Sequence, residues 1–160
     1  MPTVCDGECG VGKTPTYTDI SAVRYARTSC FGRCPNYQVL FAKISTRDPK
    51  FICEYVARSN VSKHGTYTAV CQSEVLSKVV SLLETTGFYS LSVVPDLVSD
   101  VPHLLIAVER CDVTTVLDWP EYPQRPDIDG LAKGLDRITD AQTWSKTSDS
   151  SESSWIQASF

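Results

Sequence analysis

The chain lacks an excess of positive charge. Its 160 residues include 15 basic and 19 acidic side chains, which give a formal net charge of -4. Proteins that hold nucleic acid use a basic surface to neutralise phosphates. The charge balance therefore predicts no nucleic-acid partner.

Long hydrophobic runs are also missing. No run approaches the roughly 18 apolar residues of a membrane-spanning helix, so we expect no membrane span. The first residues, Met1 to Asp6, lack the basic and apolar regions of a signal peptide. These two absences favour a cytoplasmic location.

Histidine is scarce, and this limits the catalytic options. Only His64 and His103 are present. The nucleophile-elbow pattern G-x-S-x-G does not occur, and the spacing of the histidines does not support a hydrolytic triad. The sequence therefore favours a protein without catalytic activity.

Cysteine, in contrast, is abundant. Because there are seven cysteines, at least one cannot join an intramolecular disulfide, and the redox compartment stays open. Cys53, Cys71 and Cys111 lie in or beside apolar strand-like runs. We expect these three to act as small buried hydrophobes.

The most informative stretch is Cys30-Phe31-Gly32-Arg33-Cys34-Pro35-Asn36-Tyr37. Two thiols around a turn-forming glycine, followed by a proline and an apolar run, predict a compact turn that opens a strand. Cys30 and Cys34 are candidates for a disulfide that staples this turn. A lowered thiol pKa beside Arg33 would instead suit redox chemistry.

These residues resemble an uncharacterised bacterial family, a domain of unknown function with the signature Cys-Phe-Gly-x-Cys-Pro-x-Tyr. The resemblance continues through Gly65-Thr66-Tyr67, the stretch from Ser73 to Gly87, Phe88-Tyr89-Ser90-Leu91, Asp100-Val101-Pro102 and Trp144, so it covers approximately residues 20 to 144. It implies an architecture and no activity.

Two metals are chemically compatible with the cysteines. Cys5, Cys9, Cys30 and Cys34 together could supply the four thiolates of a structural zinc site. The Cys30 to Pro35 segment also resembles the copper-binding turn of copper-delivery proteins, with His64 or His103 as the third ligand. Copper is the less favoured of the two, because the turn here opens a strand and not a helix.

The segment from Gly7 to Thr14 matches the phosphate-loop pattern G-x-x-x-x-G-K-[ST]. That loop needs a strand before it and a helix after it. Only six residues precede Gly7, and Pro15 with its neighbours opens no amphipathic helix. We therefore interpret residues 1–18 as an irregular arm that does not bind nucleotides.

Residues 19–144 predict one α+β domain. Strands are expected at Ile20 to Arg27, Tyr37 to Ser45, Phe51 to Ala57 and Thr66 to Cys71, followed by a helix from Ser73 to Gly87, a hairpin of Leu104 to Glu109 with Val113 to Trp119, and a helix through Ile128, Leu131, Leu135 and Ile138. Ser73 is the expected N-cap, and Gly87 the expected end, of the first helix. Because strands and helices do not alternate, we expect an antiparallel sheet of about six strands with the helices packed on one face.

Residues 145–160 form the expected tail. The serine- and acid-rich run from Ser145 to Ser154 predicts a flexible spacer. Trp155, Ile156 and Phe160 then form an apolar anchor, either on their own domain or on a second copy in a homo-oligomer.

These patterns favour a small non-enzymatic binding or interaction module with a protein or small-molecule partner. Its first hairpin would be made rigid by the Cys30–Cys34 turn. The alternative is a thiol-based redox or metal-handling protein that uses Cys30 and Cys34. No cofactor is expected in the first reading, and zinc or, less favoured, copper in the second.

Overall fold

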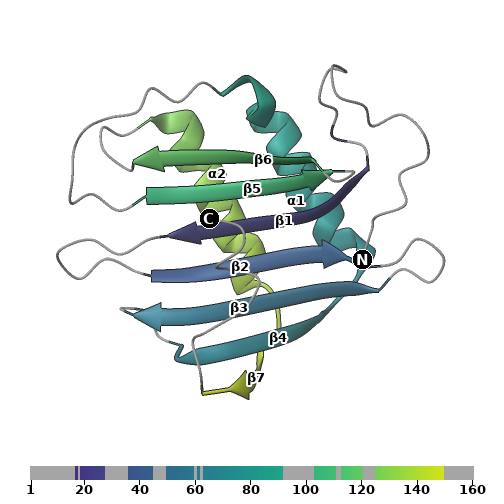
Figure 1. Ribbon diagram of the computed structural model, residues 1–160, viewed down its shortest axis with the longest axis vertical. Coiled ribbons are helices and arrows are strands. Elements are labelled where there is room, and N and C mark those ends of the chain that lie inside the picture. The colour runs from purple at the N-terminus through teal and green to yellow at the C-terminus, as the bar shows by residue number, and fades with distance from the viewer. Residues whose placement is uncertain are drawn as a thin grey trace.

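The chain folds into one seven-stranded antiparallel sheet with two helices on one face (Figure 1). The computed structural model describes residues 17, 19–27, 36–44, 50–59, 61, 63–91, 103–110, 113–120 and 125–149. In chain order the elements are β1 (Ile20–Arg27), β2 (Asn36–Lys43), β3 (Phe51–Ser59), β4 (Gly65–Cys71), α1 (Ser73–Thr86), the short helix η1 (Phe88–Ser90), β5 (His103–Arg110), β6 (Val113–Pro120), α2 (Pro126–Asp140) and β7 (Ser145–Ser148). The α+β class, the meander, the hairpin and both helices are confirmed.

The strand order is β6-β5-β1-β2-β3-β4-β7. The meander β1 to β4 forms one half of the sheet, and the later hairpin β5–β6 joins the free edge of β1. The chain reaches that edge through α1, which crosses behind the sheet (Figure 1). As a result, β1 becomes a central strand. The described residues contain no helix that is long and apolar enough to span a membrane.

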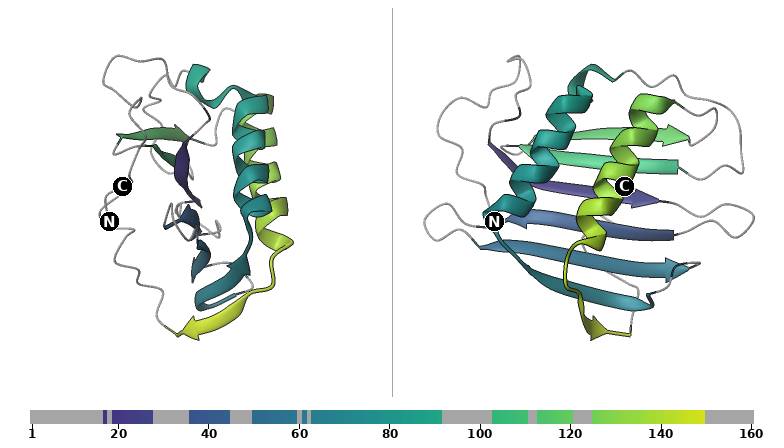
Figure 2. Two further views of the ribbon diagram at one scale, coloured as in Figure 1. Left: turned by 90° about the vertical axis from the view of Figure 1, so that its right-hand side faces the viewer. Right: turned by 180° about the vertical axis from the view of Figure 1, so that it is seen from behind.

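The core lies between the sheet and the two helices (Figure 2). Apolar residues spaced three and four apart put one stripe of each helix against the strands. The buried residues of these stripes are Leu76, Val79 and Leu83 in α1 and Ile128, Leu131, Ala132 and Leu135 in α2. For the second helix, the inward positions predicted at Ile128, Leu131 and Leu135 are confirmed, and Ile138 is partly buried.

The two ends of α1 agree only in part with those predicted from the sequence. Gly87 ends the helix in the left-handed conformation, with φ 74°, as expected. Ser73, however, is the first helical residue, and Gln72 occupies the N-cap position without a side-chain hydrogen bond. The prediction of Ser73 as the N-cap is wrong by one position, because the preceding strand already ends at Cys71.

The seventh strand was not expected. Ser145–Ser148 pairs antiparallel with β4, so the prediction of a flexible spacer is wrong for these four residues. Trp144 directs the chain there: its indole Nε1 donates a hydrogen bond to the Thr139 carbonyl at 2.9 Å, and its ring packs 5.7 Å from that of Tyr55. Strand pairing uses backbone groups, so a polar sequence can complete an open sheet edge.

Candidate functional site

A polar cluster lies beneath α2 at the end of the sheet where β1 finishes and β2 begins. Its centre is Asp136, whose carboxylate accepts hydrogen bonds from the hydroxyl of Tyr37 and, at 3.2 Å each, from the hydroxyl of Tyr25 and from Nη2 of Arg27. Nε of Arg27 also donates to the hydroxyl of Tyr37 at 3.0 Å. The hydroxyl of Tyr25 contacts Thr139 as well.

The cluster has strong electrostatic coupling. Burial raises the pKa of both Tyr25 and Tyr37, and the negative charge of Asp136 raises both further. Burial lowers the pKa of Arg27, but Tyr37 and Asp136 more than offset this, so the net shift of that pKa is upward. The phenols are therefore held neutral and the guanidinium charged.

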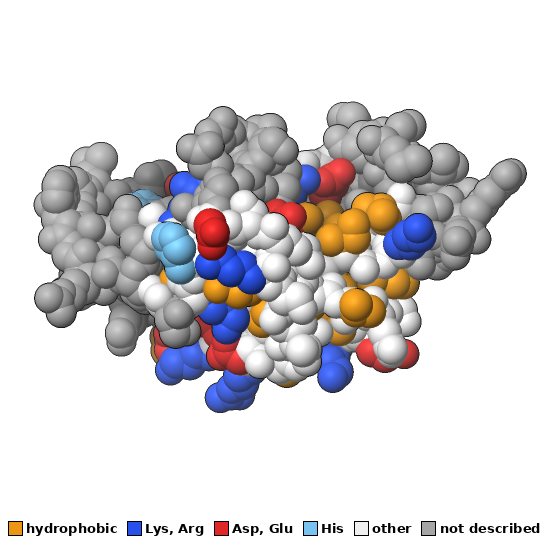
Figure 3. All heavy atoms as spheres, turned by 90° about the horizontal axis from the view of Figure 1, so that it is seen from below, with side chains coloured by type: hydrophobic (Ala, Val, Ile, Leu, Met, Phe, Trp, Pro, Cys, Tyr) orange, Lys and Arg blue, Asp and Glu red, His pale blue; other side chains and the backbone are white. Residues whose placement is uncertain are grey.

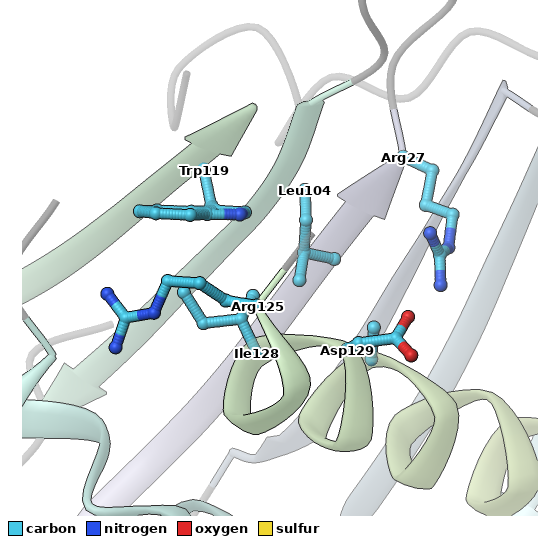
Figure 4. A pocket seen from close by; sticks show the side chains of 7 residues that line it. Arg27, Leu104, Trp119, Arg125, Ile128 and Asp129 are labelled. Carbon is cyan, nitrogen blue, oxygen red and sulfur yellow. The ribbon is translucent and has the colours of Figure 1, made fainter. Parts of the chain in front are cut away.

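A small pocket opens beside this cluster, between the first turn of α2 and strands β1, β5 and β6 (Figure 4). Its volume is about 90 Å³. The lining residues are Arg27, Leu104, Trp119, Arg125, Ile128, Asp129 and Ala132. Arg27 and Arg125 lie at opposite ends of the pocket, with apolar side chains between them (Figure 4).

Arg125 is held in place on two sides. Its guanidinium carbon lies 5.1 Å from the centre of the Trp119 ring, a cation–π contact. Its Nε and Nη2 atoms donate to the carboxylate of Asp127 at 3.1 and 2.6 Å. That hydrogen bond from Arg125 lowers the pKa of Asp127. The Arg125 side chain is therefore positioned before any ligand arrives.

The cysteines predicted to form a site lie outside the described residues. This applies to Cys5, Cys9, Cys30 and Cys34, and also to the phosphate-loop match from Gly7 to Thr14. Cys30 and Cys34 belong to the segment that joins β1 to β2, so the prediction that this segment precedes a strand is confirmed. The zinc, copper and disulfide hypotheses for these residues stay predictions.

The two histidines have ordinary surroundings. Nδ1 of His103 lies 2.6 Å from a carboxylate oxygen of Asp118 on the neighbouring strand. The backbone of His64 hydrogen-bonds the hydroxyl of Tyr67. Among the residues that the structure describes, no three potential metal ligands come together.

Cys53 and Cys71 form a disulfide between β3 and β4. The expectation that they act only as buried hydrophobes is therefore wrong for this pair, while Cys111 lies outside the described part. In the hairpin register Cys53 is opposite Ala69, which places Cys71 two residues away on the same face. The pairing is difficult to predict from the sequence because it depends on this register. Alternation along the two predicted strands does indicate that both cysteines lie on the same face of the sheet.

Neither the pocket nor the polar cluster was predicted from the sequence. For each of them, the sequence contains a charged residue at a position that should face inward. Arg27 shares the alternation of the buried Val23 and Tyr25 in β1, and Asp136 follows the buried Ala132 by four residues in α2. Charged residues at such inward-facing positions are rarely left without a partner.

The fold and the site define a small α+β domain with a one-sided helical layer and an arginine-lined pocket. The chain belongs to a family described as a domain of unknown function, DUF6438, whose family model matches residues 21–139. The comparison with curated proteins yields no match. No solved structure matches either.

Proposed function

We propose that the protein is a small non-enzymatic interaction module that holds a carboxylate group in the pocket between Arg27 and Arg125. The observation that carries this proposal is the presence of these two guanidinium groups at the two ends of an apolar recess floored by α2. Guanidinium and carboxylate groups match in charge and in planar geometry. The apolar wall formed by Trp119 and Leu104 would contact the carbon atoms next to the carboxylate.

The size of the pocket favours a side chain over a cofactor. Drug-sized ligands and cofactors occupy pockets of about 300–1,000 Å³. The volume of about 90 Å³ is well below that range. An acidic side chain or the carboxyl terminus of a protein partner is the kind of group that fits.

The acidic residues near the pocket are consistent with this ligand. Asp129 lines the pocket, but Nζ of Lys133 lies 3.0 Å from its carboxylate. Asp127 is paired with Arg125. Because each of the two carboxylates has its own cation, neither leaves an unpaired negative charge at the recess, and the first turn of α2 favours a negative charge there.

Titration of the full chain with acetate tests this proposal by following the indole N–H resonance of Trp119. We expect a saturable shift, which Arg125→Gln should reduce by half or more. Lys78→Gln removes the same charge from an exposed position in α1 and should leave the shift unchanged. Ethylammonium, a cation of similar size, should produce no shift. Equal acetate responses in the parent and in Arg125→Gln would refute the proposal.

The second candidate is a thiol-based function for Cys30 and Cys34, in redox or metal chemistry. One observation favours it: the segment that carries both cysteines follows directly on Arg27, which lines the pocket. The family match spans Cys30 to Tyr37, so both cysteines lie within the family domain.

Native mass spectrometry with and without thiol alkylation, together with elemental analysis, separates the two candidates. A structural staple predicts that the double variant Cys30→Ser, Cys34→Ser melts at a lower temperature than the parent. A thiol function predicts bound zinc or copper, or a redox activity that this variant loses while its melting temperature stays the same.

A further inference from the structure

One face of the sheet has no described helix on it, since α1 and α2 both lie on the other side (Figure 2). Tyr25 reaches α2 and so marks the helix-covered face. Its neighbour Ala26 points to the uncovered face, because successive strand residues alternate. Cross-strand pairing extends Ala26 into a row, called here the Val56 row, that consists of Thr66, Val56, Gln38, Ala26 and Leu105.

The centre of the Val56 row is buried although this face lacks a helix. Val56 has 0% of its surface exposed, Ala26 1% and Gln38 7%. Neighbouring strands cover the flanks of a side chain and leave its tip open, so full burial of a valine needs a second layer. No described element provides that layer. The cover must therefore come from something other than a described element.

The amide of Gln38 gives a second indication of a missing layer. Its Oε1 atom is buried and has no hydrogen-bond partner within the part of the chain that the structure describes. Buried polar atoms almost always have a partner. An extended segment lying over the row would bring a backbone N–H donor at each of its residues.

The described chain ends at the Val56 row. In β7, Ser148 pairs with Thr66, which is the β4 member of the row. Gly65 makes this close approach possible: a Cβ atom there would lie 2.3 Å from the Ser148 carbonyl oxygen. The chain beyond Asp149 therefore starts at the edge of the buried row.

The remaining chain is long enough to cross the row. Trp155 is the sixth residue after Asp149, and six extended residues span at most about 20 Å. The distance from β4 to β1 is three strand spacings, or about 14 Å. Trp155, Ile156 and Phe160 can thus reach Val56 and Ala26.

The N-terminal arm is a poorer candidate for this cover. Tyr17 packs on Tyr89 after α1, with ring centroids 4.8 Å apart, and accepts a hydrogen bond from the Tyr89 backbone. The chain then enters β1 at Ile20, at the opposite end of that strand from Ala26. Residues 1–16 also contain no aromatic side chain.

The opposite end of the same face is less covered. There Val70, on β4, has 96% of its surface exposed, and β7 pairs with β4 only from Thr66 to Thr68. The view from the β7 side shows hydrophobic side chains reaching the surface (Figure 3). Val70 belongs to a row with Ile52, Ala42 and Ala22. Ala42 and Ala22 have only 8% and 6% of their surface exposed, so at this end the central strands are buried while β4 is open beyond the residues that pair with β7.

We propose that residues 150–160 fold back over the uncovered face of their own chain, along the Val56 row, with Trp155, Ile156 and Phe160 packed on Val56 and Ala26. The segment forms a third layer of the domain. This inference is independent of the carboxylate pocket, which lies on the helix-covered side of the sheet.

Nuclear Overhauser measurements on the full chain test the contact directly. We expect cross-peaks from the Trp155 ring protons to the methyl groups of Val56 and Ala26. A sample that mixes two differently labelled chains distinguishes the possible sources of these cross-peaks. Contacts found only between different chains would mean that a second copy supplies the cover, and they would overturn the proposal. A Trp155 ring without contacts to the row would overturn it as well.

Removal of the segment provides a second test. In a chain truncated after Asp149, a soluble paramagnetic compound should relax the Val56 methyl groups several times faster than in the full chain. The methyl groups of Ile128, which is buried on the inner face of α2, should stay protected and so report that the domain is still folded. Trp155→Ser should give a smaller change in the same direction, and Gln157→Ala, its matched control, none. Unchanged protection of Val56 after truncation would show that another part of the chain covers the row.

Discussion

At the scale of single residues, Asp136 holds the largest number of described side-chain partners in the polar cluster. Two buried phenols and one guanidinium group depend on its carboxylate. Such a residue stabilises by satisfying its partners, since each buried donor that loses its acceptor costs about 1–3 kcal/mol.

Replacing Asp136 with alanine should lower the free energy of unfolding by about 2–3 kcal/mol, because Arg27, Tyr25 and Tyr37 then lose a common acceptor. Urea denaturation measures this change. Asp140→Ala is the matched control: it removes a carboxylate from an exposed position in the same helix, and its effect should stay within about 0.5 kcal/mol. Equal effects of the two substitutions would contradict the role given to Asp136.

The raised tyrosine pKa values predict a loss of stability in alkaline solution. Burial raises the pKa of Tyr25, Tyr37 and Tyr55 in the folded protein, whereas tyrosines of the unfolded chain ionise with a pKa of about 10. Below that pH both states keep these protons, and the stabilisation is complete. Above it the unfolded state releases protons that the folded state retains, so stability falls by about 1.4 kcal/mol per pH unit for each such tyrosine.

Urea denaturation at a series of pH values, with tyrosinate absorbance as a second probe, checks this prediction. The folded protein should resist ionisation of these tyrosines until it unfolds. Tyr37→Phe should make the alkaline loss of stability less steep by about one proton's contribution. A folded protein in which every tyrosine titrates normally would contradict the prediction.

At the scale of elements, the contact between α1 and α2 depends on a single small residue. A Cβ atom on Gly134 would lie 2.6 Å from the side chain of Leu82, whereas a Cβ on Gly130 would meet nothing within 4 Å. Both glycines weaken α2 as an isolated helix. Only Gly134 compensates for this by allowing α2 to approach α1.

Substitution of each glycine by alanine separates these two effects. Gly130→Ala should raise the free energy of unfolding by about 0.5–1 kcal/mol, because alanine favours the helix. Gly134→Ala should lower it by about 1 kcal/mol or more, because the added methyl group overpacks the interface. Thermal melting of the two variants beside the parent measures both. A similar gain for both variants would show that Leu82 moves aside without cost.

At the scale of the whole molecule, the Cys53–Cys71 disulfide stabilises the folded state mainly by restricting the conformations of the unfolded chain. It closes a loop with a sequence separation of 18 residues. Loop closure of this length should stabilise the folded state by about 3 kcal/mol. Disulfides persist mainly under oxidising conditions, so this contribution depends on the redox state of the surroundings.

The double variant Cys53→Ala, Cys71→Ala should therefore unfold at a lower urea concentration, by an amount that corresponds to about 3 kcal/mol. Reduction of the parent should produce a similar loss. Peptide mapping of the unreduced protein should find the peptides of Cys53 and Cys71 linked to each other. Recovery of both cysteines as separately alkylated residues would show that the bond is absent in solution.

The sequence alone determined the order and the type of most elements. Alternating apolar residues identify β1, and the spacing of Leu76, Val79 and Leu83 identifies α1, because burial on one face imposes the period of the element on its side chains. Gly87 marks the end of α1 because few other residues adopt its left-handed backbone. These are local preferences, and a local pattern is sufficient to express them.

The tertiary structure alone decided which distant residues meet. Arg27 and Arg125 share a pocket only because β5 and β6 pair with the free edge of β1 and α2 returns across the sheet. Cys53 meets Cys71 through the hairpin register, and the polar Ser145–Ser148 becomes a strand because the edge of β4 offers backbone partners. Pairing and packing across the sheet depend on the positions of whole elements, so a local pattern indicates which side chains face inward but not which of them meet.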